Sequence, residues 1–168
     1  MRRAIIPLLV VCLIVVAIQL SVFSNLRFAG VVIMLVWLLP IAVGLTGATT
    51  LAIGTGVLVG LLFDAHTITV FGLTAIVGGV LGYAVSPLGR EGVGDLDSAA
   101  WWVTPLIASV GGFLAPLAYM ICAEATGQFN VWRDSVISMM IVNAIAFFIF
   151  ARPMARLARV IVGEGSRR

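Results

Sequence analysis

Charged residues are scarce in this sequence. Only 10% of its 168 residues are charged, lysine is absent, and there is a single histidine. A soluble domain carries about 25% charged residues, which give it a surface that water can solvate. The shortage of charge therefore excludes a soluble globular domain of this size. The hydrophobic share of 62% and the mean hydropathy of +1.20 instead indicate an integral membrane protein.

The few cysteines and the lone histidine also limit the chemistry. Cys12 and Cys122 lie within or beside apolar stretches, where a free cysteine behaves as a small hydrophobic residue. With His66 as the single histidine, we expect neither a disulfide nor a metal site. The sequence pI of about 9.5 would suggest nucleic acid if the basic residues formed a soluble patch. They flank apolar runs instead, so we expect no nucleic-acid partner.

Apolar runs separated by short polar breaks predict an all-α membrane protein, with six transmembrane helices forming one bundle over residues 1–168. The uncharged stretch 28–63 is about twice as long as one span needs, so the chain must turn within it. Residues 44–47 are the best turn, and Pro40 would bend the span before it. The predicted spans are about 5–22, 29–45, 47–63, 70–85, 101–123 and 136–150.

The arginines predict the orientation of this bundle, because positively charged loops stay in the cytoplasm. With six spans and both ends inside, the inner side comprises the N-terminus, loop 86–99 and the basic tail 152–168. Arg27 and Arg133 would lie outside, and the other eight of the ten arginines inside. We therefore expect both termini to be cytoplasmic.

The basic tail carries Arg152, Arg156 and Arg159 at helical spacing, beside apolar residues. This pattern is typical of an amphipathic helix that follows the inner leaflet. We expect these three arginines to contact anionic lipid, and a dedicated protein contact is the alternative.

Residues that could carry out catalysis are almost missing. There is no phosphate-binding glycine loop with lysine, no His and Glu pair at helical spacing, and no nucleophile elbow. Gly78, Gly79 and Gly82 lie in a fully apolar context, which favours helix packing over nucleotide binding. We therefore expect no catalytic residue, no metal and no cofactor, and a protein that is not an enzyme.

Glycines mark the third predicted span. Gly56 and Gly60 stand one turn apart, and Asp64 lies one turn further along the same stripe at the outer end. Glycines let helices approach closely in lipid, so the stripe could pack within the bundle or receive a partner's transmembrane helix. Asp64 could be a cap or solvated residue, or it could contact the partner. Our hypothesis assigns all three residues to partner binding.

Two side-chain amides, Gln19 and Asn143, lie within predicted spans. A polar group in hydrocarbon costs free energy unless it finds a hydrogen-bond partner. We expect both amides to bond to neighbouring helices.

The run from Gly56 to Asp64, followed by Phe71 to Ala75 and then by Gly82 and Tyr83, resembles the signature of the bacterial rod shape-determining protein MreD family. That signature is a glycine-spaced apolar span ending in Gly-Leu-Leu-x-Asp, a short outer loop, and a Gly-Leu that opens the next span. The basic start of the chain and its first span are similar to the family as well.

The resemblance implies a non-enzymatic subunit of the cell-elongation machinery in the bacterial inner membrane. Such a subunit binds the bitopic protein MreC and, through it, the peptidoglycan polymerase RodA with its transpeptidase, above MreB filaments. The resemblance also implies a fold similar to the six-helix substrate-binding subunits of energy-coupling-factor transporters. A vitamin-binding transporter subunit is therefore the alternative function, and it would need polar and aromatic side chains around an outward cavity.

Overall fold

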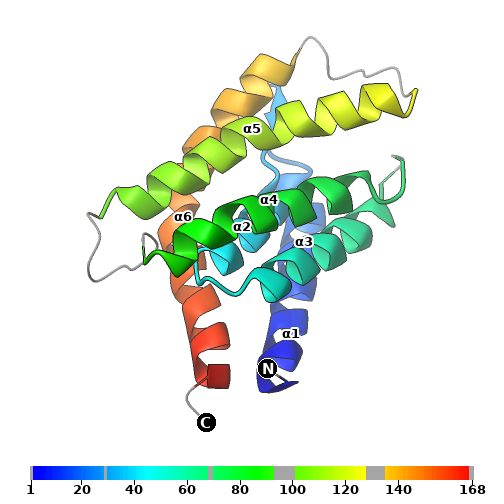
Figure 1. Ribbon diagram of the computed structural model, residues 1–168. Helices are drawn as coiled ribbons and strands as arrows, with labels where there is room; N and C mark the ends of the chain where they lie inside the picture. Colours follow the sequence, from blue (N-terminus) through cyan, green and yellow to red (C-terminus); the bar gives the residue numbers. More distant parts are fainter. Residues whose placement is uncertain (1, 29, 68–69, 93–100, 128–134, 167–168) are drawn as a thin grey trace.

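The computed structural model describes residues 2–28, 30–67, 70–92, 101–127 and 135–166. The chain is mostly helical (Figure 1). Its α-helices are α1 (Arg2–Ile18), α2 (Leu38–Gly44), α3 (Thr49–Asp64), α4 (Leu73–Arg90), α5 (Val103–Ala125) and α6 (Val136–Ser166). A π-helix, Gln19–Phe23, continues α1.

Within the described residues, four helical segments are long and apolar enough to cross a membrane: Ile5–Phe23, Leu73–Arg90, Val103–Ala125 and Val136–Gly163. They indicate a multi-pass membrane protein. The sequence predicted six such helices, and the difference lies in the second and third predicted spans.

The second predicted span, 29–45, is not one helix. It starts in an antiparallel hairpin of β1 (Arg27–Phe28) and β2 (Val31–Val32), and it continues as a 3₁₀ turn, Leu35–Trp37, before α2. Every residue from 33 to 45 is buried. Irregular backbone is tolerated at membrane depth only where protein covers it, and here the surrounding helices do so.

Pro40 does not bend a long helix as predicted. It lies in the first turn of the seven-residue helix α2, where the missing proline N–H breaks no intrahelical hydrogen bond. Pro40 is therefore compatible with the start of a short helix.

The chain reverses between α2 and α3, where the sequence placed a turn. Gly47 adopts φ 78° and donates its N–H to the Gly44 carbonyl at 2.8 Å. The third predicted span is α3, whose 16 residues measure about 24 Å against about 30 Å of hydrocarbon. Arg90 Nη2, at the end of α4, donates to Thr49 Oγ1 at 2.7 Å, so the turn and the end of α4 lie together.

The predicted inner loop starts later than expected, because α4 extends to Arg90. The part of loop 86–99 from residue 93 lies outside the described residues. The basic tail is helical, as its arginine spacing indicated, and it continues α6 without a break to Ser166. Its stripe of Ala151, Ala155, Ala158 and Ile161 is buried, so the tail packs on the bundle rather than lying apart along the leaflet.

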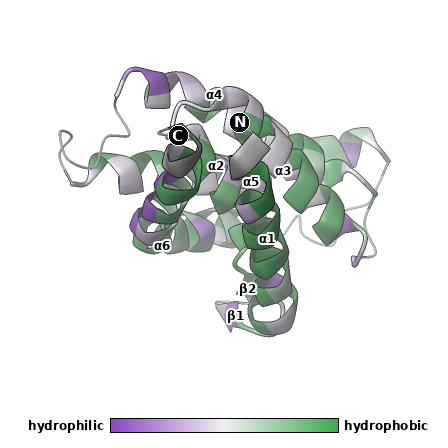
Figure 2. Cartoon of the chain, turned by 90° about the horizontal axis from the view of Figure 1, so that it is seen from below, coloured by the Kyte–Doolittle hydropathy of each residue, from purple (hydrophilic) through white to green (hydrophobic). Residues whose placement is uncertain are grey.

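The bundle is built from two closely packed helix pairs, α3 with α4 and α5 with α6, around the central α2. Trp37, Leu38, Leu39, Ile41 and Phe147 are fully buried in this core. Apolar residues cover most of α1 (Figure 2), and many of them are exposed, as expected for a surface that faces lipid. The start of α1 and the end of α6 lie at the same end of the molecule (Figure 1).

Candidate functional site

The glycines that the sequence assigned to a partner lie at the contact between α3 and α4. A Cβ atom placed on Gly56 would lie 2.3 Å from the carbonyl carbon and oxygen of Gly78. A Cβ atom on Gly60 would lie 2.3 Å from the backbone N and Cα of Ala75. Real atoms do not approach so closely, so these positions of α3 accept only glycine at this helix separation.

Asp64 ends α3 and caps the next helix. Its side chain is only 3% exposed, and its Oδ2 accepts hydrogen bonds from the N–H groups of Gly72 at 2.9 Å and Thr74 at 3.0 Å. The first N–H groups of a helix have no partner within the helix, and they carry partial positive charge. The Asp64 carboxylate therefore satisfies the start of α4 from another helix.

The stripe of Gly56, Gly60 and Asp64 is thus covered by α4 of the same chain. In this structure the stripe is not exposed to a partner's helix. The structure shows packing and capping within the bundle, which were the alternatives that the sequence left open. The physical reason is that glycine spacing predicts a close helix contact without saying which helix makes it.

Asp64→Ala is expected to lower the free energy of unfolding by about 1–3 kcal/mol, because it leaves the buried N–H of Thr74 and the half-buried N–H of Gly72 without an acceptor. Asp64→Asn should cost less, since its amide oxygen can replace Oδ2. Thermal unfolding in detergent measures both. Equal stability of the alanine variant and the wild type would contradict the capping role.

Gln19 and Asn143 bind the irregular segment between β2 and α2. Gln19 Nε2 donates to the Ile33 carbonyl, and Gln19 Oε1 accepts from the Leu35 N–H, both at 2.8 Å. Asn143 Oδ1 accepts from the Met34 N–H at 2.8 Å. The expected hydrogen bonds to neighbouring segments are present, and their partners on this segment are backbone groups that lie outside the α-helices.

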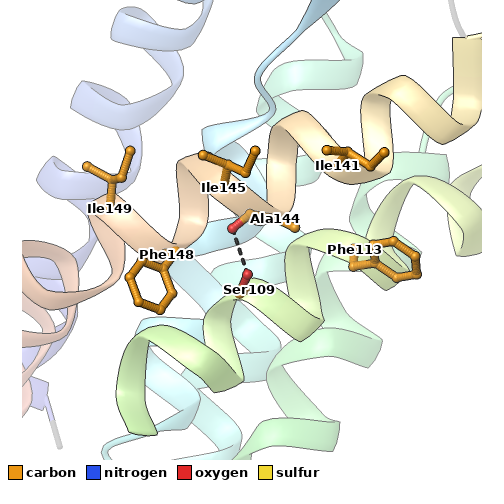
Figure 3. A pocket seen from close by; sticks show the side chains of 7 residues that line it. All are labelled: Ser109, Phe113, Ile141, Ala144, Ile145, Phe148 and Ile149. Atoms are coloured by element: carbon orange, nitrogen blue, oxygen red, sulfur yellow. Dashed lines mark hydrogen bonds between the residues drawn. The ribbon is translucent and has the colours of Figure 1, made fainter. Parts of the chain in front are cut away.

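An apolar groove of about 370 Å³ lies between α5 and α6 (Figure 3). The Ser109 hydroxyl donates to the Ala144 carbonyl at 2.7 Å and ties the two helices together at its floor. The groove is lined by Ser109, Phe113, Ile141, Ala144, Ile145, Phe148 and Ile149. Nothing in the sequence indicated this groove, because its residues are ordinary members of two apolar spans.

The arginines expected to contact lipid lie on the helix that forms this groove. Arg152 Nε donates to the Trp101 carbonyl at 3.1 Å, and the guanidinium carbon lies 5.3 Å from the centre of the Trp101 ring. Arg156 is exposed and Arg159 is half-buried. The pair of Arg152 and Trp101 therefore fixes one cation where α5 begins.

The part of the chain that the structure describes holds no group of three or more His, Cys, Asp or Glu side chains that could bind a metal ion. Cys12 and Cys122 are free thiols. The arrangements with functional potential in the described residues are thus the capped α3–α4 pair, the amide-bound segment and the α5–α6 groove.

Comparison with known proteins finds no matching family model, no similar curated protein and no similar solved structure.

Proposed function

We propose that this protein is a non-enzymatic subunit of the bacterial cell-elongation machinery that binds an MreC-like bitopic partner in the inner membrane and supports peptidoglycan synthesis. The observation that carries the proposal is the contact between Asp64 and the N–H groups of Gly72 and Thr74. Asp64 ends the first part of the MreD-like motif, and it caps α4, the helix that begins within the second part. The spacing of the motif thus has a structural reason in this chain, and this agreement between motif and contact supports the proposal.

The proposed orientation places both termini in the cytoplasm. The start of α1 and the end of α6 lie at one end of the molecule (Figure 1). Eight of the ten arginines belong to the side that the positive-inside rule assigns to the cytoplasm. Trp101 and Trp102 are 65% and 48% exposed, and they suit the headgroup level of the inner leaflet.

The partner contact requires an exposed helix face, since α4 covers the glycine stripe of α3. Exposed apolar side chains on three helices offer positions for a crosslinking scan: Ile6 on α1, Ile76 on α4 and Ile137 on α6, which are 70%, 58% and 73% exposed. A photoreactive residue at each position samples one face without disturbing the core.

Native membranes that contain the tagged protein are expected to yield an MreC-like bitopic protein on purification, and one of the three photoreactive variants should crosslink to it. RodA-type polymerase with its transpeptidase should follow in smaller amount, because it is bound through that partner. Mass spectrometry identifies the recovered chains. Recovery of an ATPase coupling module with a vitamin would instead support the transporter alternative, and recovery of neither assembly would refute the proposal.

A further inference from the structure

One stripe of α6 joins the α5–α6 groove to the arginines. Ile141, Ile145 and Ile149 line the groove at four-residue spacing (Figure 3), and Arg152 and Arg156 follow after three and four residues. Because an α-helix turns once every 3.6 residues, these side chains lie on one face of α6. The apolar groove therefore leads directly to two cations.

The cationic end is suited to an oxyanion. Arg152 is held by its hydrogen bond to the Trp101 carbonyl and by the Trp101 ring. A guanidinium group has five N–H donors, and this hydrogen bond uses one of them. Arg156 is exposed one turn further along α6. Two neighbouring guanidinium groups match the geometry of phosphate oxygens.

The length of the stripe matches one leaflet of a membrane. Ile141 and Arg152 are eleven residues apart in the sequence, which is about 16 Å along a helix. Half of the hydrocarbon core measures about 15 Å. A chain lying in the groove from Ile141 would therefore reach the headgroup level near Arg152, beside the exposed Trp101 and Trp102.

We propose that the α5–α6 groove binds one anionic phospholipid, with an acyl chain between the two helices and the phosphate at Arg152 and Arg156. Charge selects this occupant over a transmembrane helix, because an apolar helix would fill the groove and leave at its end two cations that form no ion pair with any described carboxylate. The site lies apart from the α3–α4 motif, so it does not depend on the proposed role in cell elongation.

The test compares phosphatidylglycerol with phosphatidylcholine of the same acyl chains, using native mass spectrometry of the purified protein. The wild type is expected to retain phosphatidylglycerol preferentially. A variant with both Arg152→Gln and Arg156→Gln should bind phosphatidylglycerol about 25-fold more weakly, or about fivefold for each arginine, and should bind phosphatidylcholine as before. Arg27→Gln, at an exposed arginine of β1, is the matched control and should change neither affinity.

The groove itself is tested by Ala144→Leu, which fills it and should weaken both lipids at least fivefold. Ala84→Leu makes the same change at an exposed position of α4 and should have no effect. Ser109→Leu fills the groove from α5 and replaces Ala144→Leu if that variant does not elute as a single species. Unchanged binding in the double arginine variant, or in a folded groove-filling variant, would overturn the proposal. A photoreactive residue at Ile145 that captures mainly a protein from native membranes would also overturn it.

Discussion

Gly60→Leu is expected to be among the most damaging single substitutions in the described part of this chain. Even the first side-chain atom would lie 2.3 Å from the backbone of Ala75 and 2.6 Å from the Thr74 carbonyl carbon. Backbone atoms cannot rotate away as a side chain can, so α3 and α4 must separate. Overpacking costs about 1–3 kcal/mol even where side chains can adjust, and we expect at least the upper end of that range here.

The separation of α3 and α4 would also break the cap on α4. Asp64 lies one turn beyond Gly60 and contacts the start of α4, so both contacts depend on the same helix spacing. A loss of 3 kcal/mol corresponds to a fall of about 6–12 °C in the melting temperature of a chain of this size. Thermal unfolding in detergent, followed by tryptophan fluorescence, measures it.

Gly54→Leu is the matched control for this prediction. Gly54 lies in the same helix and is exposed, and an added Cβ would meet no atom of the described residues within 4 Å. Its replacement should leave the melting temperature unchanged or raise it slightly, because leucine favours helix more than glycine does. If Gly60→Leu proved as stable as Gly54→Leu, the α3–α4 contact would be wrong, and the glycine stripe would again be available to a partner.

The sequence predicted the long helices well, because hydropathy and helical length are sufficient for a span that lipid surrounds. The predicted span 101–123 corresponds to α5 at Val103–Ala125, and the predicted span 5–22 corresponds to α1 with its π-helical end. The turn after α2 was also predictable, since the uncharged stretch was too long for one span and contained Gly44 and Gly47.

The irregular segment 33–37 was not predictable from hydropathy. An apolar run has the same composition whether it spans lipid as a helix or crosses a protein interior as buried irregular backbone. The signal for buried irregular backbone lay elsewhere in the chain, in the side-chain amides of Gln19 and Asn143. A side-chain amide within a span predicts a hydrogen bond, but the sequence does not show that its partner is the backbone of a distant segment.

For the groove and the glycine stripe, too, the sequence does not show which distant segment a residue contacts. Small residues at Gly56 and Gly60 predicted a close helix contact correctly in kind, and the structure assigns it to α4. Ser109 and Ala144 gave no comparable signal, because a groove depends on how two helices cross rather than on the periodicity of either one. A single sequence therefore does not show which helices pack against each other.

Removing the side-chain amides is expected to destabilise the centre of the bundle. Gln19→Leu leaves the Ile33 carbonyl and the Leu35 N–H without partners, and each buried polar group left unsatisfied costs about 1–3 kcal/mol. The expected loss is thus about 2–6 kcal/mol. Asn143→Leu leaves the Met34 N–H unsatisfied and should cost about 1–3 kcal/mol.

Asn25→Leu is the control for Asn143→Leu, because it also removes a side-chain amide that bonds to the carbonyl four residues earlier. Asn25 is exposed, and its Nδ2 donates to the carbonyl four residues earlier at 3.0 Å, as Asn143 Nδ2 does to Met139 at 2.9 Å. The two asparagines differ in the buried bond from Asn143 to the Met34 N–H. Asn25→Leu should therefore change the stability by less than about 0.5 kcal/mol, as surface substitutions usually do.

The double variant Gln19→Leu with Asn143→Leu tests whether the two amides act on one segment. Ile33, Met34 and Leu35 are consecutive, so loss of either amide frees backbone that the other still holds. Groups that share a partner segment couple by about 0.5–3 kcal/mol, and the double variant should lose less stability than the sum of the single variants. Hydrogen exchange at the Met34 and Leu35 N–H groups locates the effect. Additive losses of stability, with unchanged hydrogen exchange at the Met34 and Leu35 N–H groups, would show that the two side chains do not hold this segment together. Residues that share no partner do not couple.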